Sequence, residues 1–368
     1  MNKLTLCIVA ALFSASANAS WSIVNLGESV FATSINDSGQ ITGSVNANTE
    51  MERAFITDSN GQNIREISSI GSSVSLGNEI NNSGQILGVY FNGNGWSNFI
   101  TQQNGNGMVD LPIENGNTFE GINDKGQLIV GYAGNNVSHA NNIVDIVPLP
   151  GLDTFARSIN NSAQVVGYYI NEEGRRHAFI TGSDGKGIKD IGPFDDKFYK
   201  SSVAHDVNES GQVVGFISRE FGFWSQAFLT GDDGAGMIKL GTLGGNTSEA
   251  IAVNDHGVAV GLSTFSSRGG GYHSFIYAGG GLTDLNSLPE VVKAGWSDIV
   301  VTDINNNNQI VGYGNLNNEQ HSFLLSFTSD TVFTPQDFYI PPIPEPSTYL
   351  MLLAGLGLLG FVGRKSLK

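Results

Sequence analysis

Short apolar runs alternate with polar, glycine-containing turns along most of this chain, and one arrangement recurs. It reads Ile or Val, Asn, two variable residues, Gly, Gln, an apolar residue, one variable residue and Gly, as in residues 35–43. The Asn of this pattern stands at seven positions: Asn36, Asn81, Asn123, Asn160, Asn208, Asn254 and Asn305. They are 37 to 51 residues apart, a period typical of stacked or radially arranged units of about four strands each.

A few copies depart from the pattern at single positions. Ala163 and Asn308 stand where the first Gly is expected, Val258 replaces the Gln, and the third copy is one residue longer. The hairpin chemistry is otherwise kept, because Asn bonds its own backbone two residues on and Gly adopts positive φ. Each copy therefore predicts a tight turn between two strands.

Four strands are expected in each unit, and the fifth unit shows them at residues 188–192, 204–208, 212–217 and 226–230. Apolar runs bounded by Gly, Asn and Asp are typical of such strands. The last strand of six units carries a Phe in the same place: Phe55, Phe99, Phe179, Phe228, Phe275 and Phe323. We expect these rings to form the core of each unit.

The ends of the repeat array indicate how it closes. Residues 22–27 resemble the strand at 238–241, whereas no such strand follows the seventh unit. The first strand of the mature chain is therefore expected to complete the last unit, which removes the exposed edges of the array. We predict an all-β fold, a seven-bladed β-propeller closed by its N-terminal strand. An open β-solenoid is the alternative, and a degenerate third unit, which lacks its Phe strand at 138–142, leaves the blade number open.

The first 19 residues have the order of a secretory signal peptide. Lys3 precedes an apolar run, and Ala17 and Ala19 form an A-x-A site with cleavage before Ser20. The only cysteine, Cys7, lies in this segment. The mature chain is therefore expected to have no disulfides and to rely on its core and on closure of the fold.

The other end combines a proline-rich stretch, an apolar run and a basic end. Residues 349–362 are apolar or Gly apart from Tyr349, and as a helix they would extend roughly 21 Å. Positions 346–363 approach the minimum of about 17 residues for a membrane span. The basic residues after the run favour a cytoplasmic location for that end. A plain membrane anchor or a buried helix are the alternatives.

This tail resembles the PEP-CTERM sorting signal of Gram-negative bacteria. The resemblance rests on Pro344, Glu345 and Pro346, the apolar run, and Arg364 and Lys365. It implies recognition and cutting near 344–346 by an exosortase, a membrane-embedded cysteine transpeptidase, after export by the Sec machinery. It also implies a transient inner-membrane location, then the cell surface or an extracellular biofilm matrix.

The repeat itself resembles the bacterial extracellular HAF repeat family. The likeness rests on the Asn-x-x-Gly-Gln pattern together with His177-Ala178-Phe179 and its variants at His273 and His321. It supports an exported repeat protein and brings no known reaction. We divide the chain into a signal peptide at 1–19, a repeat domain at 20–330, a linker at 331–343 and a sorting signal at 344–368.

Charge excludes one class of partner. The net charge is −16, and the signal and tail carry several of the basic residues, so the mature body is more acidic still. Nucleic-acid binding needs a basic surface and is not expected. An acidic surface favours solubility.

Motifs for catalysis and metal binding are absent from the sequence. It has no His-x-x-x-His, no His-Glu-x-x-His and no Gly-x-Ser-x-Gly. The three histidines of the repeat belong to different units, so we expect them to make strand-edge hydrogen bonds. No cofactor is expected; the turns at 58–61 and 232–234 resemble calcium loops only in part, because neither has the full alternating oxygen set.

Insertions that break the repeat are the candidate ligand loops, because function on repeat scaffolds concentrates there. Asp195, Asp196 and Tyr199 lie in one, Trp224 in a second and Trp296 in a third. Aromatic rings beside acids and amides suit stacking on sugar rings, although packing at blade edges is the plainer interpretation. Adjacent carboxylates such as Asp195 and Asp196 diverge, so they make a poor glycosidase pair.

These observations favour an exported, non-enzymatic surface or matrix protein that binds an exopolysaccharide or a surface protein. The alternative is a secreted carbohydrate-active enzyme, a hydrolase or lyase, with carboxylates converging on the central channel of the propeller.

Overall fold

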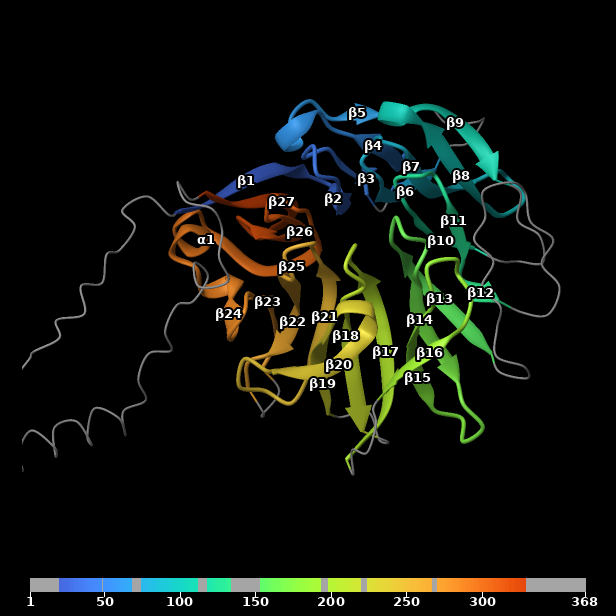
Figure 1. The fold of residues 1–368 in the computed structure, drawn as a ribbon. Coiled ribbons are helices and arrows are strands. Elements are labelled where there is room, and N and C mark those ends of the chain that lie inside the picture. The colour runs from blue at the N-terminus through green and yellow to red at the C-terminus, as the bar shows by residue number, and fades with distance from the viewer. Residues whose placement is uncertain are drawn as a thin grey trace, which may run out of the picture.

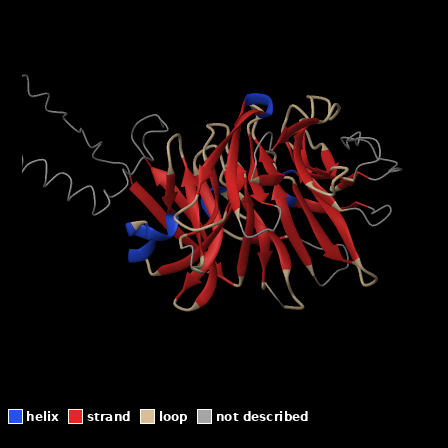
Figure 2. Cartoon of the chain, turned by 90° about the horizontal axis from the view of Figure 1, so that it is seen from below, coloured by secondary structure: helices blue, strands red, loops and turns tan. Residues whose placement is uncertain are grey.

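The seven sheets of this protein surround a common centre, which confirms the β-propeller (Figure 1). The computed structural model describes residues 20–47, 49–67, 74–111, 118–133, 153–192, 198–219, 224–266 and 270–328. The signal peptide, the linker, the tail and the degenerate stretch 138–142 lie outside these residues. Strands dominate, and helices are short and peripheral (Figure 2).

The first three blades follow one another along the chain. Blade 1 contains β2 (Val30–Ile35), β3 (Ile41–Val45), β4 (Arg53–Ile56) and β5 (Arg65–Glu66). Blade 2 contains β6 (Ser75–Ile80), β7 (Ile86–Phe91), β8 (Trp96–Gln102) and β9 (Asn106–Leu111). In the described part of blade 3, β10 (Phe119–Ile122) pairs with β11 (Leu128–Val130).

Blades 4 to 6 continue around the ring. Blade 4 contains β13 (Thr154–Ile159), β14 (Val165–Ile170), β15 (Arg176–Ile180) and β16 (Lys189–Gly192), with β12 (Tyr132–Ala133) paired to β13. Blade 5 contains β17 (Tyr199–Val207), β18 (Val213–Arg219), β19 (Ser225–Gly231) and β20 (Ala235–Gly241). Blade 6 contains β21 (Ser248–Val253), β22 (Ala259–Thr264), β23 (Tyr272–Tyr277) and β24 (Leu282–Asp284).

Blade 7 closes the ring with strands from both ends of the described chain. It contains β25 (Trp296–Ile304), β26 (Gln309–Leu316), β27 (Glu319–Thr328) and, outermost, β1 (Ser20–Glu28). β1 pairs antiparallel with β27, with Ser20 opposite Thr328. This confirms closure by the N-terminal strand. Because the ring and its cores lie within residues 20–328, we expect this part to fold as a unit.

Three short helices lie between the third and fourth strands of blades 1, 2 and 5, and two more connect blade 6 to blade 7. They are η1 (Ser59–Gly61), η2 (Gln103–Gly105), η3 (Asp232–Gly234), η4 (Leu285–Ser287) and α1 (Pro289–Lys293). Within the described part of the chain, no helix is both long and apolar enough to span a membrane.

The sequence repeat and the blade are offset by one strand. The strand at 188–192, expected to begin the fifth unit, is β16 and pairs with β15 of blade 4, Ala178 lying opposite Gly192. In blades 1, 2, 4, 5 and 6 the outer strand follows the loop after the Phe strand and folds straight back onto that strand. A blade therefore begins with its inner strand, just before the Asn turn.

The recurring Phe forms the centre of each blade, as predicted. All six are fully buried: Phe55, Phe99, Phe179, Phe228, Phe275 and Phe323. Fully burying a Phe contributes roughly 1.5–3 kcal/mol, so the repeated ring is a main source of stability in a chain without disulfides.

Every inner strand has a β-bulge three residues before its Asn. In blade 1 the register shifts between Ala32 and Ser34, and the other six inner strands shift at the equivalent place. The last Gly of the pattern faces this bulge: a Cβ on Gly43 would lie 1.9 Å from the carbonyl oxygen of Phe31. That contact explains why this position is Gly, and the bulge sets which side chains reach the channel.

Candidate functional site

The turn of each inner hairpin carries a buried asparagine that bonds to the next blade. Asn36 Nδ2 donates to the carbonyl of Asn81, and the same bond recurs from blade to blade at 2.9 to 3.1 Å. Asn305 Nδ2 donates to the carbonyl of Asn36 and completes the circle. We call these seven residues the asparagine ring: Asn36, Asn81, Asn123, Asn160, Asn208, Asn254 and Asn305. Each is only 3 to 4% exposed.

Each of these side chains also supports its own turn. Asn81 Oδ1 accepts from the backbone N–H groups of Ser83 and Gln85, at 3.1 and 2.9 Å. Asn81 Nδ2 donates a second bond to Gln85 Oε1 at 2.9 Å. All donor and acceptor positions of the amide are thus used, which is what burial of a polar side chain requires. The Gln of the pattern is explained by this bond.

Two departures from the sequence pattern compensate for each other. Blade 6 has Val258 in place of Gln, so Asn254 lacks that acceptor within its own turn. Asn308 of blade 7, which replaces a Gly, places Oδ1 2.8 Å from Asn254 Nδ2. Asn308 has φ +55°, a conformation that Asn tolerates better than most residues. The side-chain acceptor for Asn254 Nδ2 is thus supplied by blade 7 and not by blade 6, and the hydrogen bonds of the asparagine ring stay complete.

The residues that follow the asparagine ring form a second circle, the rim. They are Asp37, Asn82, Asp124, Asn161, Glu209, Asp255 and Asn306. Each backbone N–H donates to a side-chain oxygen of the next member, at 2.7 to 3.0 Å. Amide side chains also donate to the carboxylates beside them, as Asn306 Nδ2 does to Asp37 and Asp255.

Acids and amides alternate around the rim with one exception. A circle of seven has an odd number of members and cannot alternate throughout, so two acids, Glu209 and Asp255, are neighbours. Burial raises the pKa of Glu209, and the negative charges of Asp255 and Asp124 raise it further, against the hydrogen bond from the Asn161 N–H. The two acids that are direct neighbours in the rim therefore repel each other.

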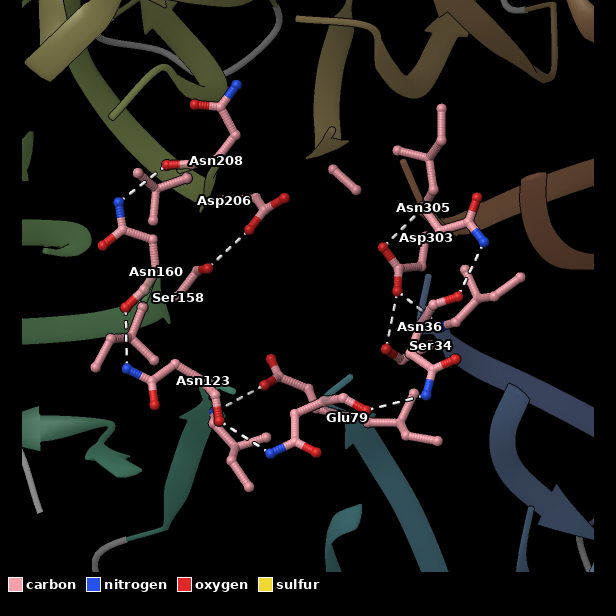
Figure 3. A pocket seen from close by; sticks show the side chains of 18 of the residues that line it. Ser34, Asn36, Glu79, Asn123, Ser158, Asn160, Asp206, Asn208, Asp303 and Asn305 are labelled. Atoms are coloured by element: carbon pink, nitrogen blue, oxygen red, sulfur yellow. Dashed lines mark hydrogen bonds between the residues drawn. The ribbon is translucent and has the colours of Figure 1, made fainter. Parts of the chain in front are cut away.

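Below the rim, the bulges bring two successive side chains of most inner strands to the wall of a central channel of about 820 Å³. Glu120, Arg157 and His205, each three residues before an Asn of the ring, line this channel. Three further acids stand two residues before the Asn: the channel carboxylates Glu79, Asp206 and Asp303, from β6, β17 and β25. Figure 3 shows them around an open centre. The equivalent positions of the other blades are small: Ser34, Gly121, Ser158 and Ala252.

Each channel carboxylate is held by an adjacent blade at one of these small positions or beside it. Asp303 Oδ2 accepts from Ser34 Oγ at 2.8 Å and from the Ile35 N–H at 2.9 Å. Asp206 accepts from Ser158 Oγ at 2.7 Å on one side and from the Val253 N–H at 2.9 Å on the other.

The third acid makes the same kind of bond. Glu79 Oε2 accepts from the Ile122 N–H of blade 3 at 3.1 Å. The carboxylates therefore link blades as well as line the channel.

Burial raises the pKa of all three channel carboxylates, and repulsion from other acids adds to the rise for Glu79 and Asp303. Desolvation raises the pKa of Asp303 to about 7, with a further contribution from the charge of Asp206. Desolvation likewise raises the pKa of Asp206 and, strongly, that of Glu79. The channel therefore contains a carboxyl group that exchanges a proton near neutral pH.

Metal binding has no support from this wall. Among the described residues, no group of three or more His, Cys, Asp or Glu side chains is arranged to hold a metal ion. The partial calcium turns make protein contacts instead: Asn60 Oδ1 accepts from Gln309 and Asp233 Oδ1 accepts from Gln164.

Two of the candidate ligand residues meet at the opposite end of blade 5. The guanidinium of Arg219 lies 5.8 Å from the ring centroid of Tyr199 and 4.8 Å from that of Trp224. It also lies 5.4 Å from the Phe198 ring, and Lys239 Nζ lies 4.5 Å from Tyr199. We call these residues the blade 5 cluster. Tyr199 is buried, whereas Phe198 is 65% and Trp224 42% exposed.

The remaining candidates do not join this cluster. Asp195 and Asp196 lie outside the described residues. Trp296 is 5% exposed and packs edge-on against the core ring Phe323, with centroids 5.6 Å apart. Because Trp296 begins a strand and faces the core, it offers no face to a ligand, and its assignment to a ligand loop is corrected.

The repeat histidines bond to the outer strand of their own blades. His177 Nδ1 lies 2.9 Å from Asp190 Oδ2, and His273 Nδ1 lies 2.8 Å from Asp284 Oδ2. His321 contacts Asn25 of β1 at 3.2 Å. These are the strand-edge bonds that were expected, and they fasten the outer strand.

Sequence reasoning missed the rim and the channel carboxylates. A signal for both exists: with the repeats aligned on the Asn, the next column holds only acids and amides. The column two residues before the Asn holds three acids among small residues. That these columns face one channel follows only from the bulges and from ring closure.

Comparison with known proteins identifies the tail and the fold. Residues 342–366 match the PEP-CTERM protein-sorting motif. No curated protein sequence matches the chain. Among solved structures, oligogalacturonate lyase from Vibrio parahaemolyticus is similar, with 7% identity, 84% of this chain and 97% of that chain covered, and a TM-score of 0.51.

Two further structures are similar at lower scores. Virginiamycin B lyase from Staphylococcus aureus has 8% identity, 84% and 99% coverage and a TM-score of 0.48. TolB from Acinetobacter baumannii has 12% identity and a TM-score of 0.38, with 80% of this chain and 64% of TolB covered, so the chain spans just under two thirds of TolB. At such identities the likeness shows the fold alone. The chain is thus an exported β-propeller with a PEP-CTERM motif, which implies exosortase processing and sorting to the surface.

Proposed function

We propose that this propeller binds a glycan of the cell surface or extracellular matrix and takes no part in breaking it. The observation that carries the proposal is the blade 5 cluster, in which two exposed aromatic rings surround one guanidinium. Exposed apolar surface of this kind on a soluble protein marks an interaction site.

The chemistry of the cluster suits a sugar. The faces of Phe198 and Trp224 can stack on the C–H face of a pyranose ring, and the planar guanidinium of Arg219 offers several N–H donors to hydroxyl or carboxylate oxygens. Tyr199, buried beneath Arg219, keeps the guanidinium in place. A rigid strand end therefore holds the apolar and polar parts of the site together.

We further propose that an exosortase cuts the tail at Pro344, Glu345 and Pro346, and that the released propeller remains at the cell surface or in the matrix. The test replaces these three residues by Ala in the producing bacterium. The uncut chain should then accumulate in the inner-membrane fraction, whereas the native chain leaves it. Native chain that stays uncut in the inner membrane would contradict the proposal.

A carbohydrate-active enzyme is the second candidate function, because three carboxylates converge on the channel and one of them titrates near neutral pH. Glycoside hydrolysis uses a pair of carboxyl groups, one protonated and one ionised. Against this, each channel carboxylate is already occupied by hydrogen bonds from a neighbouring blade.

One experiment separates the two functions. Residues 20–342, which contain every described strand, are mixed with exopolysaccharide from the producing bacterium and run on a sizing column. Co-elution with intact polymer is the expected result. Conversion of the polymer to shorter fragments would make the chain an enzyme, and absence of both effects would leave a protein as the partner.

A further inference from the structure

Six aromatic side chains of the described residues are exposed to solvent, and they occur in three blades. They are Phe91 (38%), Trp96 (53%), Phe198 (65%), Trp224 (42%), Phe265 (43%) and Tyr272 (57%). Blades 2, 5 and 6 each contribute two. In a chain with 21 Phe, 10 Tyr and 4 Trp, the other described rings are buried or partly buried, so this grouping is selective.

All six lie at the same end of the ring. In blade 2, β7 ends at Phe91 and β8 begins with Trp96, directly opposite it. Tyr272 pairs with Thr264 at the equivalent hairpin of blade 6, and Tyr199, beside Phe198, pairs with Arg219 in blade 5. Inner strands run from this end toward the asparagine ring, so the aromatic hairpins project from the end that lies opposite the asparagine ring. We call this end the aromatic face.

The chain leaves the ring on the other side. Ser326 pairs with Gln309, which directly follows the Asn turn of blade 7, so the end of β27 lies at the asparagine-ring end. The sorting motif matched at residues 342–366 follows from there. The described chain therefore ends on the side opposite the aromatic face.

Resting on the proposed function, we infer that the aromatic face is a multipoint binding surface for one chain of a pyranose polysaccharide. Blades 5 and 6 are neighbours, and blade 2 lies across the ring. A polymer that crosses this end meets ring pairs on both sides, and the second contact is made at a high effective concentration.

The surroundings of the rings favour a sugar polymer over a protein. The pairs belong to the hairpins of separate blades, and polar residues lie beside two of them: Asn92 and Asn94 between Phe91 and Trp96 in blade 2, and Arg219 in blade 5. A protein partner usually covers one continuous patch with a desolvated centre. Separate stacking points with amide and guanidinium donors beside them match the repeating apolar faces and hydroxyls of a polysaccharide.

Affinity electrophoresis tests the inference. Residues 20–342 run through native gels that contain increasing amounts of exopolysaccharide from the producing bacterium. Single variants Trp96→Ala, Trp224→Ala and Tyr272→Ala should each weaken retardation by roughly 2- to 10-fold, the range expected for one aromatic contact. The triple variant should lose about 100-fold, because the multipoint contribution disappears.

The matched control is Val109→Ala with Ile238→Ala, which removes exposed apolar side chains of similar exposure, 47% and 49%, from the outer strands β9 and β20. The control should bind as the native chain does. A triple variant that binds like the native chain would overturn the aromatic face, and with it the blade 5 cluster as the binding site, while glycan binding by the propeller would stand. A native chain that is not retarded would overturn both. Retardation abolished by protease treatment of the polysaccharide would assign the face to a protein.

Discussion

The two ends of this propeller are built from the same repeat but differ in how uniform they are. At one end, all seven blades place an asparagine in the same buried position, and each one bonds to the next blade. At the other end, the hairpins differ from blade to blade, and among the residues that the structure describes only three of them expose aromatic rings. The difference shows that positions bonding one blade to another must repeat, whereas positions facing solvent are free to diverge toward function.

The largest effect is expected from breaking the asparagine ring. Asn305→Ala removes the bond to the carbonyl of Asn36, the bond to Gln309 Oε1 and the acceptor for two backbone N–H groups. Leaving these buried groups unpaired should lower the free energy of unfolding by about 3 to 4 kcal/mol, measured by urea denaturation. Asn315→Ala in the same blade, an exposed residue bonded to Asp298, should cost less than about 0.5 kcal/mol. Equal losses of unfolding free energy for the two variants would show that the asparagine ring contributes no more to stability than an exposed residue does.

The channel carboxylates add a pH dependence at the asparagine-ring end. The pKa of Asp303 rises from 3.8 to about 7 on folding, so the folded state holds this proton at pH values where the unfolded chain has lost it. The stabilising contribution is therefore complete below pH 4 and disappears as the pH rises toward 7.

Relative to Asp303→Asn, the native chain should lose about 3 to 4 kcal/mol between pH 4 and 7.5, measured by denaturation at each pH. Ser34→Ala removes a hydrogen bond that lowers this pKa, so it should shift the loss to higher pH. A native chain whose pH profile matches that of Asp303→Asn would disprove the assignment.

A smaller effect tests the compensated exchange within the asparagine ring. Asn308→Gly alone removes the Oδ1 atom that accepts from Asn254 Nδ2. Val258→Gln alone adds a second side-chain oxygen where Asn308 Oδ1 already accepts this bond. The double variant restores the usual pattern. A double-mutant cycle should give a favourable coupling of about 1.5 kcal/mol. Additive effects would mean that the two departures are unrelated.

The smallest effect on stability is expected at the aromatic face. Trp224→Ala should change the free energy of unfolding by no more than about 1 kcal/mol, because the ring is exposed and contributes mainly its contact with Arg219. Urea denaturation measures this change. A loss comparable to that of Asn305→Ala would show that the ring supports the fold and does not serve a ligand.

Sequence patterns predicted the structure correctly at positions where a residue type can occupy only one kind of environment. Phe179 and its equivalents could be assigned to the core because an apolar ring in the same place of each repeat must be buried somewhere in that unit. Asn208 was correctly placed in a hairpin turn, but its second role, a bond to Asn254 in the next blade, was not anticipated, because contacts between blades depend on how the units are arranged. Trp296 was assigned to a ligand loop, and its packing against Phe323 in the core of blade 7 was not anticipated.

The sequence by itself determined the strand units, the closing role of the first strand and the sorting motif of the tail. These follow from local patterns of apolar residues, turns and targeting segments, which act over one repeat or less. Only the tertiary structure decided that the asparagines form a circle, that Glu79, Asp206 and Asp303 face one channel, and that six aromatic rings share one end. The asparagine circle joins residues up to 269 positions apart, and the positions of these features are set by closure of the ring, which no single repeat encodes.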